Sequence, residues 1–337
     1  MGACWFSLDR IHSTAGVPAG LPGTAQEAEA IMTRPTLPPI RGAACAAVAV
    51  AILCASAAAQ DLTAVDDGGG LLSLCLATRP PATPWAVWWN WSFAPVVVVP
   101  LILLPGLVWV PGSRGHRGGA SRIKGACFAG GWALLAIALV SPLCRMAATL
   151  AWAHMVQHVI LVALAPALLV LGAPRVRPLR GWGRRAAGRP AAAGILYAAA
   201  IWISHLPAVY QAALGNATVH VAVVCGLLAV SLFFWRAALD PLVDPGAASG
   251  GAASVALLSA MIQTGGLGAL LAFSPTAWYP VFAGRAEAWG LTPLEDQQLA
   301  GLIMWVPMGA IYLGAALAVT TALVFRRRPP PPLLPWR

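Results

Sequence analysis

The chain has 337 residues, of which 59% are hydrophobic and only 9% are charged, and its mean hydropathy is +0.75. A soluble domain carries about 25% charged residues, so this composition excludes a soluble globular protein. The net charge of +10 does not indicate a nucleic-acid partner, because the basic residues lie in short segments between apolar runs. These runs are roughly 20 residues long, the length that spans a lipid bilayer as a helix. We therefore expect an all-α, polytopic transmembrane helix bundle.

The N-terminal region has the layout of a cleaved secretory signal peptide at residues 32–59. Arg34 and Arg41 precede an apolar stretch of about 14 residues, which ends in three alanines before Gln60. An uncleaved first helix is the alternative. Residues 1–31 have no periodicity and no targeting pattern, so we expect translation to begin at Met32 and the segment before it to be an artefactual extension.

Seven apolar spans are predicted within residues 92–325. They follow a polar periplasmic segment, residues 60–91, whose end is rich in tryptophan, a residue enriched at membrane–water interfaces. A short Arg/Pro-rich tail occupies residues 326–337. The expected spans are approximately 92–110, 125–143, 150–172, 191–209, 218–235, 252–273 and 299–325.

The distribution of Lys and Arg predicts the orientation of these spans. The segments 111–124, 173–190, 236–251 and 326–337 hold 15 basic residues, whereas the alternate segments 60–91, 144–149, 210–217 and 274–298 hold 3. Basic residues are retained on the cytoplasmic side, so the N-terminus is expected outside and the C-terminus inside a bacterial inner membrane. A cleaved signal peptide followed by seven spans requires the same orientation.

Histidines are the main polar residues within the predicted spans. His154 and His158 lie four apart, on one face of a helix, and the orientation places them near the periplasmic end together with His205 and His220. Ionisable residues within membrane spans are costly and are therefore candidates for function. Imidazole and thioether ligands suit copper, and three methionines are expected at similar depth: Met146, Met155 and Met304. The plain alternative is that each histidine makes a hydrogen bond between helices.

Two further features bear on this predicted site. Asp296 precedes the last span, where it is expected either to cap that helix or to face the histidines across the bundle. Cys75 and Cys144 are both expected on the outer side, so a disulfide between them is conceivable. No spacing supports it, and we interpret both cysteines as small apolar packing residues.

Absent residues argue against several other classes of membrane protein. Met155 occupies the position that a general-base Glu would take in a zinc-protease helix. Lys124 is the one lysine and lies between spans, so no span carries a retinal-binding lysine. No carboxylate lies in the middle of a span, as proton-coupled transport usually requires. Paired histidines that bind haem remain an open alternative.

Three sequence blocks resemble the CtaG family of cytochrome c oxidase assembly factors, the polytopic membrane type. These blocks are HMVQHVILVALAPALLVLGAP (154–174), WISHLPAVYQAAL (202–214) followed by His220, and DQQLAGLIMWVP (296–307). By position, the histidines of the family match His154, His158, His205 and His220, and its acidic residue matches Asp296. The family commonly carries another histidine one turn after His220, where this chain has Val224.

The resemblance implies a non-enzymatic role in maturing a haem–copper oxidase. Our leading hypothesis is a factor that holds copper at its periplasmic side, or receives it from a periplasmic copper donor, and passes it to cytochrome c oxidase subunits. The alternatives are a bis-histidine haem-binding oxidoreductase subunit and a purely structural assembly scaffold. The expected metal ligands are His154, His158, His205 and His220, with Asp296 and Met304 as supporting groups.

Overall fold

The computed structural model describes residues 75–76, 80–109, 119–172, 189–243 and 250–326, which all belong to one compact unit, Ile40–Arg337. The expected extension, the signal peptide and the tail beyond residue 326 lie outside the described residues. Every regular element in the described part is helical, without a strand, so the prediction of an all-α fold is confirmed there. Apolar segments in a bilayer must satisfy their backbone groups internally, which a helix does within a single segment.

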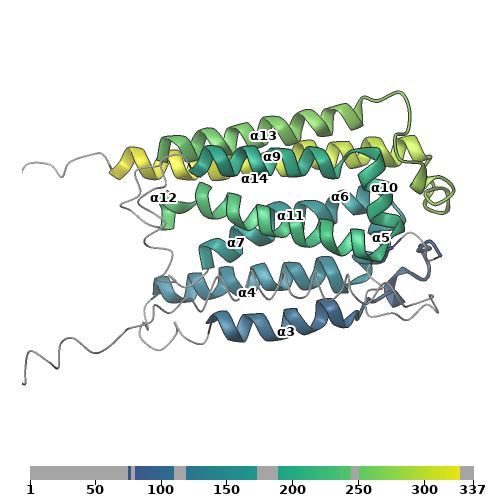
Figure 1. The fold of residues 1–337 in the computed structure, drawn as a ribbon, viewed down its shortest axis with the longest axis horizontal. Helices are drawn as coiled ribbons and strands as arrows, with labels where there is room; N and C mark the ends of the chain where they lie inside the picture. The colour runs from purple at the N-terminus through teal and green to yellow at the C-terminus, as the bar shows by residue number, and fades with distance from the viewer. Residues whose placement is uncertain (1–74, 77–79, 110–118, 173–188, 244–249, 327–337) are drawn as a thin grey trace, which may run out of the picture. The chain divides into compact units, whose positions relative to one another are not determined.

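The long helices run side by side, and the short helix α10 crosses them at one end (Figure 1). Between α6 and α7 the chain forms one π-helical stretch, Ile160–Leu164. Short 3-10 turns lie at Val87–Trp89, Pro280–Phe282 and Glu287–Trp289. The α-helices are α3 (Pro95–Trp109), α4 (Gly119–Val140), α5 (Pro142–Ala147), α6 (Ala151–Val159), α7 (Ala165–Gly172), α9 (Arg189–Ser204), α10 (Pro207–Gly215), α11 (Ala217–Ala238), α12 (Asp240–Val243), α13 (Gly250–Ala272) and α14 (Pro293–Arg326).

Five helical segments in the described residues are long and apolar enough to cross a membrane. They are Arg122–Val140, Ala151–Gly172, Ala217–Ala238, Gly250–Ala272 and Pro293–Phe325. The pair α9–α10 gives a sixth if its bent helices are counted as one span, and α3 contributes a shorter apolar helix, Pro95–Pro105. The structure thus supports five or six spans, and the seven that we expected stay a prediction.

The predicted fourth span, residues 191–209, is wrong in its outer boundary. Its helix ends at Ser204, and α10 continues at an angle of 72° to α9. Pro207 explains the break, because the residue before a proline is disfavoured in helical conformation. Leu206 is accordingly extended, with φ −60° and ψ 130°, and Pro207 starts α10 at a position where no backbone N–H is needed.

Helices α13 and α14 pack against each other more extensively than any other pair of described helices. Gly268 and Gly301 face each other where the two backbones meet, so that a Cβ added to Gly301 would lie 2.5 Å from the backbone oxygen of Gly268. Small residues at such crossings let transmembrane helices approach closely. This packing holds the start of α14, and therefore Asp296, in a fixed position at the end of the bundle.

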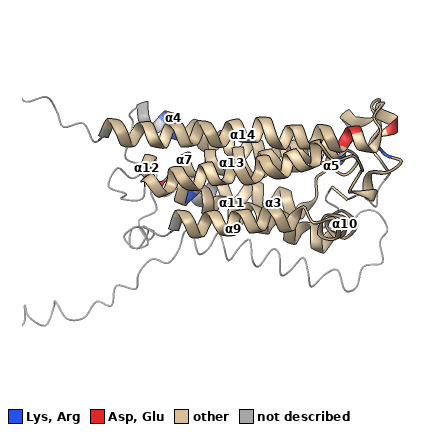
Figure 2. Ribbon diagram, turned by 90° about the horizontal axis from the view of Figure 1, so that it is seen from above, with Lys and Arg blue, Asp and Glu red and all other residues tan. Residues whose placement is uncertain are grey.

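Charged residues of the described part gather toward the two ends of the bundle (Figure 2). One end holds the start of α4, with Arg122 and Lys124. The opposite end holds α5, α10 and the 273–292 connection, and the described part of the 60–91 segment packs there. The backbone N–H of Ser92 donates to Val140 O at the end of α4, and the Trp289 indole donates to Ala82 O.

Candidate metal centre

Four histidines line one cavity near the end of the bundle that carries α5 and α10. The cavity has a volume of about 40 Å³, enough for two or three water-sized groups and too small for a porphyrin. The structure therefore brings together all four histidines that the sequence singled out. The lining residues are His154, Gln157, His158, Leu161, Val162, Ser204, His205, Tyr210, Ala213, His220, Val223, Val224 and Leu227.

Three of the rings are held by backbone carbonyls through Nδ1. The partner of His154 is Ala147 O at 3.3 Å, that of His205 is Ile201 O at 2.8 Å, and that of His220 is Ala213 O at 3.0 Å. A carbonyl oxygen only accepts hydrogen bonds, so Nδ1 carries the proton and Nε2 of a neutral ring carries the lone pair. This arrangement fixes the tautomer and the ring orientation, as second-shell partners of metal-binding histidines do.

The Nε2 atoms of His158, His205 and His220 are buried and have no hydrogen-bond partner among the described residues. The hydroxyl of Tyr210 is also buried and has no hydrogen-bond partner among these residues. Buried polar atoms are nearly always paired, with protein or with water. Several unpaired polar atoms around one cavity indicate a binding site for a water molecule or a metal ion.

The histidine rings contact one another and the ring of Tyr210 around this space. His158 and His205 have ring centroids 5.0 Å apart at an interplanar angle of 88°. His154 lies 4.8 Å from the ring of Tyr210, which stacks in turn on Tyr279 at 4.2 Å. The Tyr279 hydroxyl donates to His205 O, so the broken segment between α9 and α10 is held in place from the 273–292 connection.

Asp296 does not line the cavity. One carboxylate oxygen accepts from Ala151 N at 2.7 Å and the other from Trp152 N at 3.0 Å, so the side chain caps α6 from across the bundle. The expectation that it caps its own helix is wrong, because Thr292 and Glu295 form that cap through reciprocal hydrogen bonds. Asp296 instead fixes the start of the helix that carries His154 and His158.

The methionines expected at this depth also lie away from the cavity lining. Met155 and Met304 are buried in the main hydrophobic core. Met146 packs beside a small cluster that contains Leu150. The cavity lining therefore offers imidazole, amide and phenol groups, without a thioether sulfur.

Two lining residues were missed by sequence reasoning. Gln157 donates to Ala138 O of α4 at 2.7 Å, and Tyr210 packs its ring between those of His154 and Tyr279. Gln157 had a detectable signal, because a buried amide within an apolar span is costly and it lies directly before His158. Tyr210 had no such signal in the sequence, because only the bend between α9 and α10 brings its side chain to the cavity.

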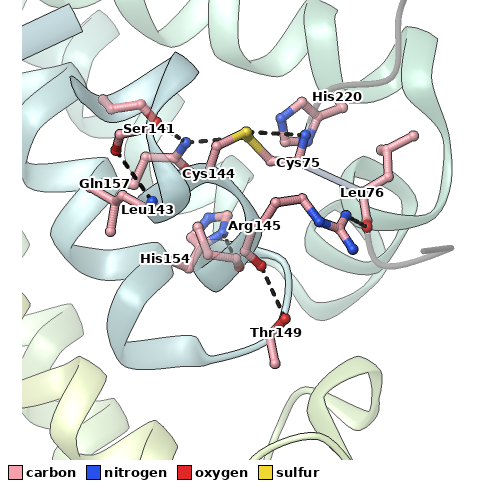
Figure 3. The surroundings of a disulfide bond; sticks show 12 residues. Cys75, Leu76, Ser141, Leu143, Cys144, Arg145, Thr149, His154, Gln157 and His220 are labelled. Carbon is pink, nitrogen blue, oxygen red and sulfur yellow. Dashed lines mark hydrogen bonds between the residues drawn. A yellow bond between two sulfur atoms is a disulfide. The ribbon is translucent and has the colours of Figure 1, made fainter. Parts of the chain in front are cut away.

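A disulfide joins Cys75 to Cys144, with their Cα atoms 5.0 Å apart (Figure 3). Our interpretation of these cysteines as packing residues is therefore wrong. Both are buried against Ala148, and Cys75 Sγ accepts a hydrogen bond of 3.5 Å from Gln157 Nε2. The bond attaches the segment before α3 to the end of the bundle, directly beside a residue that lines the cavity.

The π-helical stretch begins two residues after His158. A π-helix displaces the regular i→i−4 pattern and often occurs at functional sites. Here the Val162 carbonyl accepts from the indole Nε1 of Trp235 at 2.9 Å. This hydrogen bond stabilises the irregular backbone along one wall of the cavity, since Val162 is also a lining residue.

Trp235→Phe is expected to lower the free energy of unfolding by about 1 kcal/mol, because it removes the indole donor to the buried Val162 carbonyl. Thermal unfolding of the detergent-solubilised protein measures the change. Trp132→Phe is the matched control, since the Trp132 indole nitrogen has no hydrogen-bond partner in the described part of the chain. Equal losses in the two variants would contradict a role for the indole hydrogen bond.

The imidazoles suit a transition metal such as copper, but the donor set is not closed around one. Among the described residues, no three His, Cys, Asp or Glu side chains already form a group able to hold a metal ion. Neutral imidazoles with free Nε2 atoms are donors that copper accepts. A metal at this cavity would thus require the rings to converge further or additional ligands to join them.

Comparison with known proteins gives one match. Residues 106–326 match the family model described as cytochrome c oxidase caa3 assembly factor, which covers all four histidines and confirms the resemblance seen in the sequence. No curated protein and no solved structure matches the chain.

Proposed function

Because the chain belongs to the family of cytochrome c oxidase caa3 assembly factors, we propose that it holds copper at the four-histidine cavity and passes it to an oxidase subunit. The proposal places the chain in the bacterial inner membrane, with the cavity at the periplasmic side. The excess of Lys and Arg in the segments at the opposite side, 15 against 3, supports this orientation.

One observation carries the proposal. Three buried Nε2 atoms surround a cavity without partners, and two of them belong to rings whose Nδ1 atoms are fixed by carbonyls. Helix-bridging histidines, the plain alternative, account for the Nδ1 bonds of His154 to α5 and of His220 to α10. They do not account for the unpartnered Nε2 atoms around a shared cavity. Copper(I) accepts neutral imidazole ligands, and neutral ligands let the ion leave without separating opposite charges.

The residue at position 224 bears on the number of ligands. Val224 lines the same cavity, so the histidine that relatives commonly carry there would face the same space. Its absence leaves His154, His158, His205 and His220 as the imidazole ligands. One imidazole ligand fewer weakens the binding of copper, which suits a protein that must release copper to an oxidase subunit.

The test is the copper content of the oxidase in cells that carry His158→Ala with His205→Ala. These rings form the edge-to-face pair and both have unpartnered Nε2 atoms. We expect about a tenfold or greater loss of oxidase copper, on the scale seen when a metal site is disturbed. His116→Ala is the control, because His116 belongs to a segment predicted to be cytoplasmic.

Normal oxidase copper, with the double variant present at normal levels, would overturn the copper role and favour a structural scaffold. The absorption spectrum of the purified protein tests the remaining alternative. A Soret band that tracks the protein would indicate haem, which the small cavity disfavours.

A further inference from the structure

The two sulfurs of the Cys75–Cys144 disulfide lie one side chain away from the histidine cavity. Gln157 connects the two features: its side chain lines the cavity, and its Nε2 donates to Cys75 Sγ at 3.5 Å. Figure 3 shows His154, His220 and Gln157 among the side chains around the disulfide. Cys75 Sγ is therefore in contact with a cavity-lining side chain, but in the disulfide the sulfurs are not thiolates, the form of cysteine that binds metals.

Hydrogen bonds around the disulfide hold the same segments together independently of the covalent bond. Arg145, next to Cys144, donates to Leu76 O at 3.1 Å and to Pro80 O at 2.6 Å. Ala82 N donates to the Thr149 hydroxyl at 2.9 Å. Reduction of the disulfide would therefore leave the two thiols close to each other and close to Gln157.

We propose that Cys75 and Cys144, when reduced, form with His154 and His220 a copper(I) site that opens and closes with the redox state of the disulfide. The inference rests on the proposed function, because it takes copper as the cargo. Thiolates are among the ligands that select copper(I), and copper is the metal of the proposed function. The described residues, with the disulfide formed, do not already make a closed group, so the thiols and the imidazoles would converge on the ion as it binds.

The redox step balances through thiol–disulfide exchange. A dithiol protein of the periplasm supplies two electrons and two protons to the Cys75–Cys144 bond and itself becomes a disulfide. Copper(I) binding then displaces protons from the thiols. Reoxidation by a protein disulfide takes two electrons from the thiolates and withdraws both sulfur ligands at once, so copper is held less tightly and is released toward its acceptor.

The experiment measures copper(I) affinity in the full-length, detergent-solubilised protein by anaerobic competition with a chromophoric copper(I) chelator. The remaining cysteines are first replaced by serine, so that Cys75 and Cys144 are the only thiols. These replacements are at Cys4, Cys45, Cys54, Cys127 and Cys225. We expect the reduced form to bind copper(I) at least about a hundredfold more tightly than the oxidised form, since two thiolate ligands are gained.

Three controls assign the gain to this site. Cys75→Ser with Cys144→Ser should bind like the oxidised form whether or not reductant is present. Reduced protein whose thiols are blocked by iodoacetamide should do the same, which tests the idea without a change in sequence. His154→Ala with His220→Ala should lower the affinity of the reduced form, because the histidines share the site.

The outcomes separate this inference from the proposed function. Equal histidine-dependent binding in both redox states would overturn the redox site and leave the copper role intact. No copper(I) binding in either state would overturn both. A gain that persists after the thiols are blocked, or that is unaffected by loss of His154 and His220, would overturn the shared site.

Discussion

Gly301→Ala is expected to destabilise the bundle by about 2 kcal/mol or more, the cost of forcing extra volume into a packed interface. The added Cβ would lie 2.5 Å from Ala272 N and from Gly268 O. Both are backbone atoms, so no side chain can rotate away and the two helices must separate. Thermal unfolding in detergent, followed by circular dichroism, measures the loss.

Gly314→Ala is the matched control on the same helix. A Cβ at Gly314 meets nothing within 4 Å, and alanine is favoured over glycine in a helix by about 1 kcal/mol. The two substitutions should therefore shift the unfolding temperature in opposite directions. A shift of the same sign and size in both would show that the close crossing of α13 and α14 does not limit stability.

Asp296→Ala is expected to cost about 3 kcal/mol and to loosen the histidine cavity. It leaves the backbone donors of Ala151 and Trp152 without their acceptor, and each unpaired buried group costs about 1–3 kcal/mol. It also removes a negative charge from the positive end of the α6 dipole. Asp296→Asn should cost less, because its amide oxygen still accepts one of the two hydrogen bonds.

Unfolding temperature gives the ranking of these variants, and hydrogen exchange at the start of α6 gives the location of the effect. Glu295→Ala is the neighbouring control, since Glu295 is exposed and bonds within its own helical turn. We expect it to leave exchange in α6 unchanged. If Asp296→Ala and Glu295→Ala have the same effect on α6, the carboxylate does not hold that helix.

The sequence was sufficient for features that depend on local spacing. The i,i+4 pair His154 and His158 shares a helix face because helical geometry requires it, and the runs of apolar residues predicted α11 and α13 to within a few residues. His205 and His220 were expected at the same depth as this pair from the order of the spans, and they line the same cavity.

Features that depend on long-range contacts could not be predicted from the sequence. The cap of Asp296 on Ala151 joins residues 145 apart, and the disulfide joins residues 69 apart. Nothing in the local sequence of Cys75 distinguishes a bonded cysteine from a packed one. The bend after Ser204 was in principle readable from Pro207, but apolar character continues past the break and concealed it.

The cap on α6 also constrains the order in which the chain reaches its final form. Residues 151–158, which carry two of the four histidines, leave the ribosome and enter the membrane well before Asp296 does. Until α14 arrives, the first turn of α6 lacks the acceptors that close it. The cavity is therefore completed by a helix that is synthesised after all those that line it, and a nascent chain that stops before α14 should insert most of the bundle without assembling the site.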